Sequence, residues 1–236
     1  MSDAAGVAGR RVVVTGATSE SGAAVCAALV AAGAEVVAVG SDAGRLDALA
    51  ERVPGVRVEM CDLSDSAAVS ELAERLSGGG AGVDGVVHLV GGWVGGRGIV
   101  GQTDDGWSAM ERSFRTLRAT LRAFYPALVA STAGRAVFVS SVSTGAPTAS
   151  GADYTAAKAA SESWLRSVAA GFATDAPDRA AATIFAVKAL VDDRMRAADP
   201  EKPFDGFTDV ADLAAAVVGL WNAPAAELNG ARIVLA

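Results

Sequence analysis

The 236-residue chain is poor in cysteine, histidine, lysine and tyrosine. Its two cysteines, Cys26 and Cys61, are too few for a disulfide framework or a metal cage, and both stand in apolar runs typical of buried thiols. No metal site is therefore expected. No uncharged apolar run reaches about 18 residues, which excludes a membrane-spanning helix. The N-terminus also lacks a basic segment followed by an apolar one, so we expect no signal peptide and a cytoplasmic protein.

Charged residues are also scarce, at 20% of the chain, and the acidic ones predominate to give a net charge of −7. An acidic surface repels phosphate backbones, so nucleic acid is not an expected partner. Hydrophobic residues make up 51% of the chain, which excludes intrinsic disorder and is ample for a large core. At this length we expect residues 1–236 to form one domain.

Short β-branched runs alternate with longer helical stretches along the whole chain. Seven strands separated by helices require parallel pairing, because each crossover carries the chain back along the sheet. Several runs are apolar on both faces, as in strands covered by helices on both sides. The sequence therefore predicts an α/β fold with a doubly wound parallel sheet of seven strands and helices on both faces. The expected strands are 11–15, 35–40, 56–60, 85–92 with its loop, 136–141, 182–187 and 231–235, and the expected helices are 20–32, 45–53, 66–77 after an Asp65 cap, 104–130, 152–173 and 209–222 after an Asp209 cap.

A glycine-rich turn, TGATSESG (15–22), joins the first expected strand to the first expected helix. Glycines here let backbone N–H groups and the helix N-terminus approach a pyrophosphate, although a plain tight turn would use them too. A second glycine-rich loop begins at Gly91, at the carboxyl end of the fourth strand, where ligands bind in such sheets. The candidate cofactor-binding residues of these two segments are Thr15, Gly16, Thr18, Ser19, Glu20, Gly22 and Gly91.

Tyr154 and Lys158 stand four residues apart in an expected helix, and Ser141 ends the strand before it. A spacing of four places both side chains on one helix face, one turn apart. With only two tyrosines and three lysines in the chain, such a set would arise by chance in roughly 0.2% of cases. The pattern indicates a catalytic triad, and a solvated tyrosine and lysine on a surface helix are the alternative.

With these motifs the sequence resembles the short-chain dehydrogenase/reductase family, in its short single-domain branch, from about residue 10 to 236. The family motif TGxxxGxG matches at Thr15, Gly16 and Gly22. The resemblance implies a Rossmann fold and an NAD(P)-dependent oxidoreductase that transfers a hydride between a nicotinamide cofactor and a carbonyl or secondary alcohol of a small molecule. The family commonly forms tetramers through its two long helices, so a homo-oligomer, either a dimer or a tetramer, is expected.

The resemblance also assigns roles to the three catalytic residues. Tyr154 would be the general acid or base, although a free phenol titrates near pH 10, too high for work at neutral pH. Lys158 would stabilise the phenolate, lower the pKa of Tyr154 and hold the nicotinamide ribose. Ser141 would hydrogen-bond the substrate oxygen.

The residues expected at the adenine end of the cofactor favour NADP(H) over NAD(H). Asp62 matches the family aspartate that contacts the adenine amino group, with a turn or helix cap as the alternative reading. Gly40 and Ser41 stand where the family carries an acidic residue for the ribose 2′-hydroxyl of NAD. Because that acid is missing, Ser41, with Arg45 nearby, is expected to receive a 2′-phosphate instead.

Glu20 departs from the family pattern at the middle glycine of the TGxxxGxG motif. A carboxylate at the helix start satisfies the helix dipole itself and would repel a pyrophosphate. Either its side chain turns outward, or the site binds cofactor poorly, or it no longer serves a cofactor. The alternative function is therefore a catalytically silent or non-redox protein of the same fold, acting as a partner subunit or a ligand-binding regulator.

Other departures lie around the expected catalytic centre. His88, the only histidine, opens HLVG (88–91) in place of the family's NNAG, and we expect it to be packed or hydrogen-bonded rather than catalytic. Phe114 replaces a helix asparagine that supports a water relay to the lysine. Ser113 beside it is expected on a different helix face.

The last departures concern the substrate side of the site. Lys188 and Ala189 replace the family's PG pair, and Asp193 replaces a threonine that touches the carboxamide, from which Asp193 could still accept a hydrogen bond. The segment between Asp193 and Asp209 is expected to act as a short lid. Trp93, Phe204 and Phe207 either line an apolar pocket or are ordinary surface or core aromatics.

Overall fold

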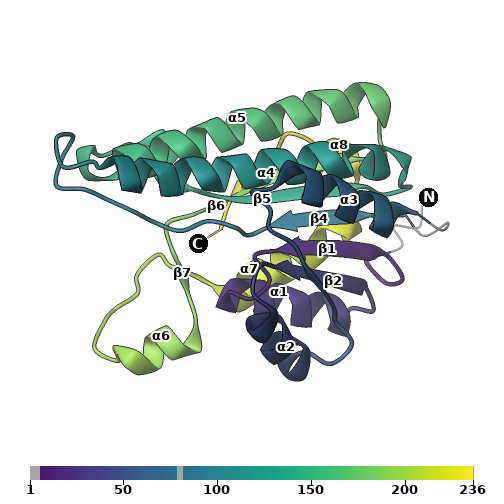
Figure 1. Cartoon of the computed structure of the whole chain (residues 1–236), viewed down its shortest axis with the longest axis horizontal. Coiled ribbons are helices and arrows are strands. Elements are labelled where there is room, and N and C mark those ends of the chain that lie inside the picture. The colour runs from purple at the N-terminus through teal and green to yellow at the C-terminus, as the bar shows by residue number, and fades with distance from the viewer. Residues whose placement is uncertain (1–5, 79–81, 236) are drawn as a thin grey trace.

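The main sheet has seven parallel strands in the order β3-β2-β1-β4-β5-β6-β9 (Figure 1), in a computed structural model that describes residues 6–78 and 82–235. The predicted doubly wound α/β fold, a Rossmann fold, is confirmed. Residues 1–5, on which the expectation about a signal peptide partly rests, lie outside the described residues. The strands are β1 (Arg11–Thr15), β2 (Glu35–Gly40), β3 (Arg57–Met60), β4 (Gly85–His88), β5 (Arg135–Ser141), β6 (Ala181–Val187) and β9 (Arg232–Val234).

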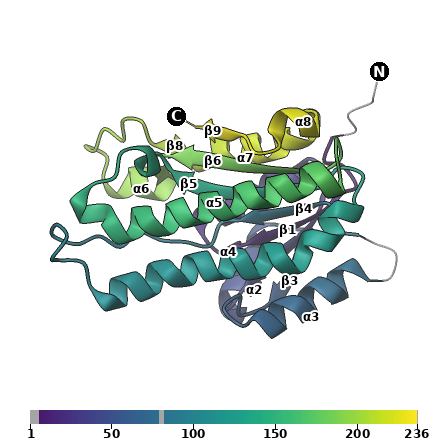
Figure 2. The same cartoon turned by 90° about the horizontal axis from the view of Figure 1, so that it is seen from above.

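Helices cover both faces of this sheet (Figures 1 and 2). On one face lie α3 (Ser66–Ser77) and the two longest helices, α4 (Asp104–Ala130) and α5 (Ala152–Asp175), which run side by side in Figure 2. The other face is covered by α1 (Glu20–Ala31), α2 (Ala43–Arg52), α7 (Val210–Gly219) and α8 (Ala225–Leu228).

Successive residues of the central strand pack into two different hydrophobic cores. Val13 belongs to the core beneath α3, α4 and α5, whereas Val12 and Val14 belong to the core beneath α1, α2 and α7. Large side chains such as Phe124 and Phe172 are fully buried in the first core. Each such burial contributes about 1.5–3 kcal/mol to stability. The buried sheet therefore holds the carboxyl ends of its strands in fixed positions.

Side-chain caps fix where several helices begin. The carboxylate of Asp65 accepts from the backbone N–H groups of Ala67 and Ala68, and that of Asp209 accepts from Ala211, as the sequence predicts. A cap of this kind stabilises a helix by about 1 kcal/mol.

Residues 190–209 contain structure that the sequence pattern did not predict. They hold the six-residue helix α6 (Asp193–Ala198), and β7 (Leu190–Val191) pairs with β8 (Thr208–Asp209) in a separate small sheet. The expected helix 209–222 ends at Gly219 and continues as a 3-10 turn. Such elements, like α8, are too short to show a hydrophobic period. Among the described residues no helix is long and apolar enough to cross a membrane.

Candidate active site

The turn between β1 and α1 packs so closely that two of its glycines leave no room for a side chain. Gly16 has a φ of +71°, and a Cβ there would lie 2.8 Å from the backbone carbonyl carbon of Leu89. A Cβ on Gly22 would lie 2.6 Å from the Cα of Ala17 and closer still to the carbonyl oxygen of Gly16. Ser19 caps α1 by accepting from the N–H of Gly22 at 3.0 Å. Glycine is therefore required at both predicted positions, because any Cβ there would collide with backbone atoms.

We expect Gly22→Ala to destabilise the protein by about 2–3 kcal/mol, because the atoms in its way are backbone atoms that cannot move aside. Urea unfolding measures the change. Gly44→Ala in the first turn of α2 is the matched control, since a Cβ there makes only an ordinary contact of 3.6 Å with Asp42. Equal stability of Gly22→Ala and the native protein would contradict the packing described here.

Glu20 points away from the turn. Its carboxylate pairs with the guanidinium of Arg52 on α2, with Oε2 3.1 Å from Nη1, and 43% of the glutamate side chain is exposed. An exposed pair of this kind contributes at most about 1 kcal/mol to stability. It nevertheless turns the negative charge outward, which is the first of the three possibilities that the sequence leaves open.

The ends of β2 and β3 carry the residues expected near the adenine. Arg45 reaches back to the β1–α1 turn, where Nη2 donates to the carbonyl of Thr18 at 3.0 Å. Ser41 and Arg45 are both exposed. Asp62 is exposed too, and its Oδ1 accepts from the N–H and the hydroxyl of Ser64, which hold the pKa of Asp62 below its usual value. Asp62 therefore stabilises the turn after β3, as the alternative reading expects. Its contact with the adenine remains a prediction.

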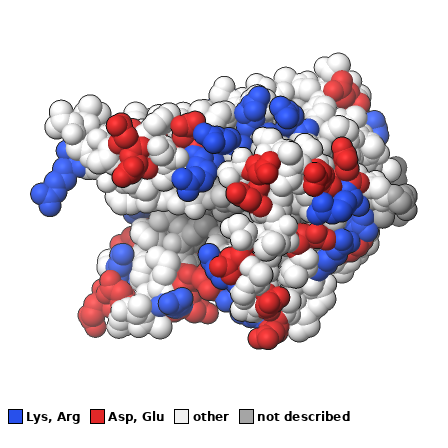
Figure 3. All heavy atoms as spheres, viewed as in Figure 1, with Lys and Arg blue, Asp and Glu red and all other residues white. Residues whose placement is uncertain are grey.

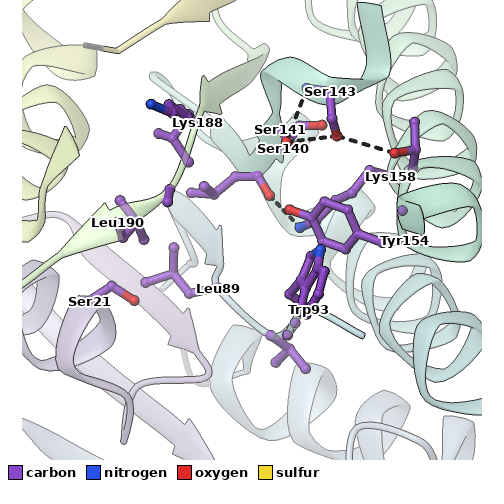
Figure 4. A pocket seen from close by; sticks show the side chains of 18 of the residues that line it. Ser21, Leu89, Trp93, Ser140, Ser141, Ser143, Tyr154, Lys158, Lys188 and Leu190 are labelled. Carbon is purple, nitrogen blue, oxygen red and sulfur yellow. Dashed lines mark hydrogen bonds between the residues drawn. The ribbon is translucent and has the colours of Figure 1, made fainter. Parts of the chain in front are cut away.

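A cavity of about 460 Å³ opens at the carboxyl ends of the central strands (Figure 4). Figure 3 shows the hollow on this face of the molecule. Tyr154 and Lys158 of α5 lie on the same side of the cavity as Trp93, opposite Ser21 of α1 and Leu190 (Figure 4). Of the predicted site residues, the lining contains Ser19, Gly91, Ser141, Tyr154 and Lys158. The others lie outside the lining, namely Thr15, Gly16, Thr18, Glu20, Gly22, Ser41, Asp62 and Asp193.

A chain of hydroxyl groups orients Ser141. Its Oγ accepts from the N–H of Ser143 at 3.1 Å and from the hydroxyl of Ser143 at 2.9 Å. The hydroxyl of Thr155 donates in turn to Ser143 at 3.3 Å. Because both acceptor positions of Ser141 are occupied, its own proton is available for donation to Tyr154 or to a molecule in the cavity.

Lys158 is held by the sheet rather than aimed at the phenol. Its Nζ donates to the carbonyl of Val139 at 2.8 Å and lies 4.6 Å from the ring centroid of Phe138, but 5.8 Å from that of Tyr154. Burial lowers the pKa of Lys158 to about 8, against the opposing charge of Glu162. Burial also raises the pKa of Tyr154, and the hydrogen bond from Ser141 only partly offsets this. The expected lowering of the phenol pKa by Lys158 is therefore not found in this geometry.

His88 is fully buried and hydrogen-bonded, as predicted. Its Nδ1 lies 2.8 Å from the hydroxyl of Thr15, and its Nε2 lies 3.4 Å from that of Thr116. Burial, together with the charge of Lys158, lowers the pKa of His88 to about 3, so the imidazole is neutral at physiological pH. Thr15 is fully buried as well and does not line the cavity.

Ser113, not Phe114, faces Tyr154 and Lys158. A small secondary cavity beside Tyr154 and Lys158 is lined by Ser113 but not by Phe114. The hydroxyl of Ser113 donates to the carbonyl of Ala109 within α4. Ser113 thus lies on a different helix face from Phe114, as expected, but it is the face of Ser113 that borders Tyr154 and Lys158.

Comparison with known proteins identifies the family. The sequence profile of the short chain dehydrogenases matches residues 10–176. This chain belongs to the short-chain dehydrogenase family. Among curated proteins, L-xylulose reductase of Bos taurus is 43% identical over 82 residues, which is 35% of this chain and 32% of that protein. The polyketide synthase GfsA of Streptomyces halstedii is 40% identical over 92 residues, or 36% of this chain and 1% of that synthase. The match therefore spans a third or less of these relatives.

Solved structures resemble this short-chain dehydrogenase over nearly its whole length. The NADPH-bound short chain oxidoreductase of Pseudomonas aeruginosa PAO1, which contains an atypical catalytic center, has a TM-score of 0.81 and 24% identity. The alignment covers 96% of this chain and 95% of that one. At this identity the likeness shows the shared fold.

The aromatic residues of this short-chain dehydrogenase divide between the cavity and the segment 193–209. Trp93 lines the cavity, although 68% of it is exposed. Phe204 and Phe207 instead pack edge to face, 5.6 Å apart, outside the lining. Lys188 lines the cavity, and its Nζ donates to the carbonyl of Asp205 at 2.7 Å, which links the residue after β6 to the segment 193–209.

Sequence reasoning missed the polar groups behind Ser141 and Lys158 of this short-chain dehydrogenase. Ser143 and Thr155 orient Ser141, as described above. Buried Glu162 pairs with the partly exposed Arg232 next to the same turn. For Glu162 a signal existed, because it follows Lys158 by four residues and so lies one turn further along α5. Among the described residues no cluster of three or more His, Cys, Asp or Glu side chains is placed to hold a metal ion.

Proposed function

We propose that this short-chain dehydrogenase is an NADP(H)-dependent oxidoreductase that acts on a carbonyl or secondary alcohol of a small molecule, with Tyr154 as the acid and base. The observation that carries the proposal is the convergence of Ser141, Tyr154 and Lys158 in one cavity of about 460 Å³. Cavities of this size suit small molecules and parts of cofactors. The family membership and the NADPH bound to the relative from Pseudomonas aeruginosa support the same assignment.

The residues of the cavity fit a dinucleotide. The β1–α1 turn admits no side chain at Gly16 or Gly22, and Glu20 directs its charge toward Arg52 instead. Because the carboxylate of Glu20 is directed elsewhere, a phosphate group can bind at the N-terminus of α1 without being repelled by it. We assign Ser19 and Gly91 to contacts with the cofactor, because both line the cavity. A bound nicotinamide would supply the hydride.

Each catalytic residue then has a task that its surroundings permit. The raised pKa of Tyr154 keeps the phenol protonated at neutral pH, so it can give its proton to the oxygen of a substrate carbonyl. Ser141 donates its free proton to the same oxygen and steadies the charge that develops there. Lys158, with a pKa of about 8, is mostly charged at neutral pH and stabilises the phenolate that remains. Oxidation of an alcohol runs through the same groups in reverse.

The preference for NADP(H) rests on Ser41, which follows β2, and on Arg45 in the first turn of α2, both of which are exposed. We expect Arg45→Ala to raise the dissociation constant of NADPH by about tenfold, because one charge-assisted hydrogen bond to a 2′-phosphate is lost, and to leave that of NADH unchanged. Fluorescence titration of both nucleotides measures this. Arg57→Ala, an exposed arginine on β3, is the control. Equal weakening of both nucleotides in Arg45→Ala would contradict a 2′-phosphate contact.

A screen for activity tests the reaction class. The purified protein is mixed with NADPH and a panel of aldehydes and ketones that includes L-xylulose, the substrate in the name of the partly matching bovine relative. Loss of nicotinamide absorbance that depends on the carbonyl compound supports the proposal. Binding of NADPH with no turnover on any member, in either direction, would favour the catalytically silent alternative.

A further inference from the structure

Glu162 is a carboxylate buried behind the catalytic residues, with only 4% of its side chain exposed. It stands one turn beyond Lys158 on α5 and does not line the main cavity. An unpaired carboxylate at such a site would cost several kcal/mol, so its partners decide whether it remains charged.

Four side chains donate to this carboxylate. The hydroxyls of Ser140 and Thr144 donate to Oε1 at 2.6 and 3.0 Å. The Nε of Arg232 lies 3.2 Å from both oxygens, and Nη2 of Arg166 lies 2.9 Å from Oε2. Burial acts to raise the pKa of Glu162, but these hydrogen bonds and the charge of Arg232 outweigh it and hold the pKa below its usual value. Glu162 is therefore an anion at neutral pH.

The same network reaches the backbone of the catalytic serine. Arg232 lies on β9, and its Nη2 donates to the carbonyl of Ser141 at 3.0 Å. The same Nη2 also donates to the hydroxyl of Thr144 at 2.9 Å. The pair of Glu162 and Arg232 thus joins the end of β5, the 3-10 turn that follows it and β9. A shift of this pair would move the backbone that carries Ser141.

Glu162 also sets the electrostatic surroundings of Lys158. The side chains that face Lys158 are His88 from β4, Phe138 from β5, and Tyr154 and Glu162 from α5. His88 is neutral, and the phenol of Tyr154 is protonated at neutral pH, so the carboxylate is the anion that acts on the ammonium. It opposes the burial that favours loss of the lysine proton.

We propose that Glu162, held in place by Arg232, is a positioning residue that keeps the buried Lys158 ammonium charged and fixes the turn that carries Ser141. The inference rests on the proposed function only in taking Lys158 and Ser141 as catalytic. The electrostatic link itself is a property of the protein without substrate.

The test follows the titration of Lys158 by NMR of protein labelled at its lysine side chains. The chain has only three lysines, so the signal of Lys158 is identified by its loss in Lys158→Met. In Glu162→Gln we expect the pKa of Lys158 to fall by about one unit, because the opposing negative charge is gone. Glu162→Asp keeps the charge and should restore most of the native value. Arg166→Gln removes an exposed partner and leaves the carboxylate, so it is the matched control.

Two outcomes overturn the inference, namely an unchanged Lys158 titration in Glu162→Gln, or equal falls in Glu162→Gln and Glu162→Asp. If Glu162→Gln does not fold, Arg232→Gln takes its place. Removal of the positive charge next to Glu162 should then move the Lys158 titration to higher pH, and a fall would overturn the proposal. None of these titrations needs turnover, so their outcome does not depend on the proposed function. The proposed function is contradicted separately, if the native protein binds no nicotinamide nucleotide.

A second measurement, the pH profile of turnover, distinguishes this positioning role of Glu162 from a role in folding alone. Turnover of carbonyl compounds should decline as pH rises through the pKa of Lys158, because the charged ammonium is lost. In Glu162→Gln that decline should begin at lower pH, by the same interval as the NMR titration. A uniform loss of turnover at every pH, with the profile unmoved, would assign Glu162 to folding alone and contradict the proposal.

Discussion

Replacing Tyr154 with phenylalanine should lower turnover of a carbonyl substrate by about 10²–10⁴-fold, the usual contribution of a placed general acid. The variant lacks the one phenol in the cavity but keeps the ring, so the packing against Lys158 is retained. NADPH binding should stay within about twofold of the native value, because the hydroxyl acts on the substrate oxygen. Steady-state rates and a fluorescence titration of the same preparation measure the two quantities.

The other tyrosine of the chain provides the control for this experiment. Tyr125 lies on α4, stacks on Phe172 and donates its hydroxyl to Asp175 at 2.7 Å, outside the cavity lining. Tyr125→Phe should therefore leave turnover unchanged. Native turnover in Tyr154→Phe, or an equal loss in both variants, would remove the assigned acid–base role.

Lys158→Met should lose both turnover and cofactor affinity, which distinguishes it from Tyr154→Phe. Methionine preserves much of the buried stem of Lys158 but cannot donate to the carbonyl of Val139 or stabilise a phenolate. We expect turnover to fall by about 10²-fold or more, and the dissociation constant of NADPH to rise by about tenfold if Lys158 holds the ribose. Rates and titration again separate the two effects.

Lys202→Met is the matched control, since Lys202 is exposed in the segment 193–209, outside the cavity lining. Its removal should change neither quantity. An unchanged affinity for NADPH in Lys158→Met would show that the lysine acts on the phenol alone. Undiminished turnover would contradict its place in the mechanism.

The fold was predictable because its signals are local and repeated. Apolar strands such as 11–15 and the caps at Asp65 and Asp209 each fix one element, and seven alternations leave few topologies. The smaller elements were not predictable, because α6 and the β7–β8 pair are too short to carry a period. That residues 1–236 form one domain, and that the protein forms a homo-oligomer in the cytoplasm, remain predictions.

The candidate site was predictable where spacing alone decides the geometry. Tyr154 and Lys158 share a helix face, and Ser141 ends the strand that meets it, so all three reach one cavity. The sequence could not show that Glu20 turns toward Arg52, because that contact joins residues 32 positions apart. It could not show that Ser113, rather than Phe114, borders Tyr154 and Lys158, because this depends on how α4 packs against α5. It also misjudged the direction of the Tyr154 pKa, which burial raises, while Lys158 donates to the carbonyl of Val139 instead.

The most direct test of the central claim is a titration of the purified native protein with NADPH and with NADH, followed by nicotinamide fluorescence or by heat. The outward position of Glu20 and the closely packed Gly16 and Gly22 predict saturable NADPH binding in the micromolar range, tighter than that of NADH. Absence of binding for either nucleotide up to millimolar concentration would contradict a nicotinamide-dependent function. Ser141, Tyr154 and Lys158 would then serve a non-redox role.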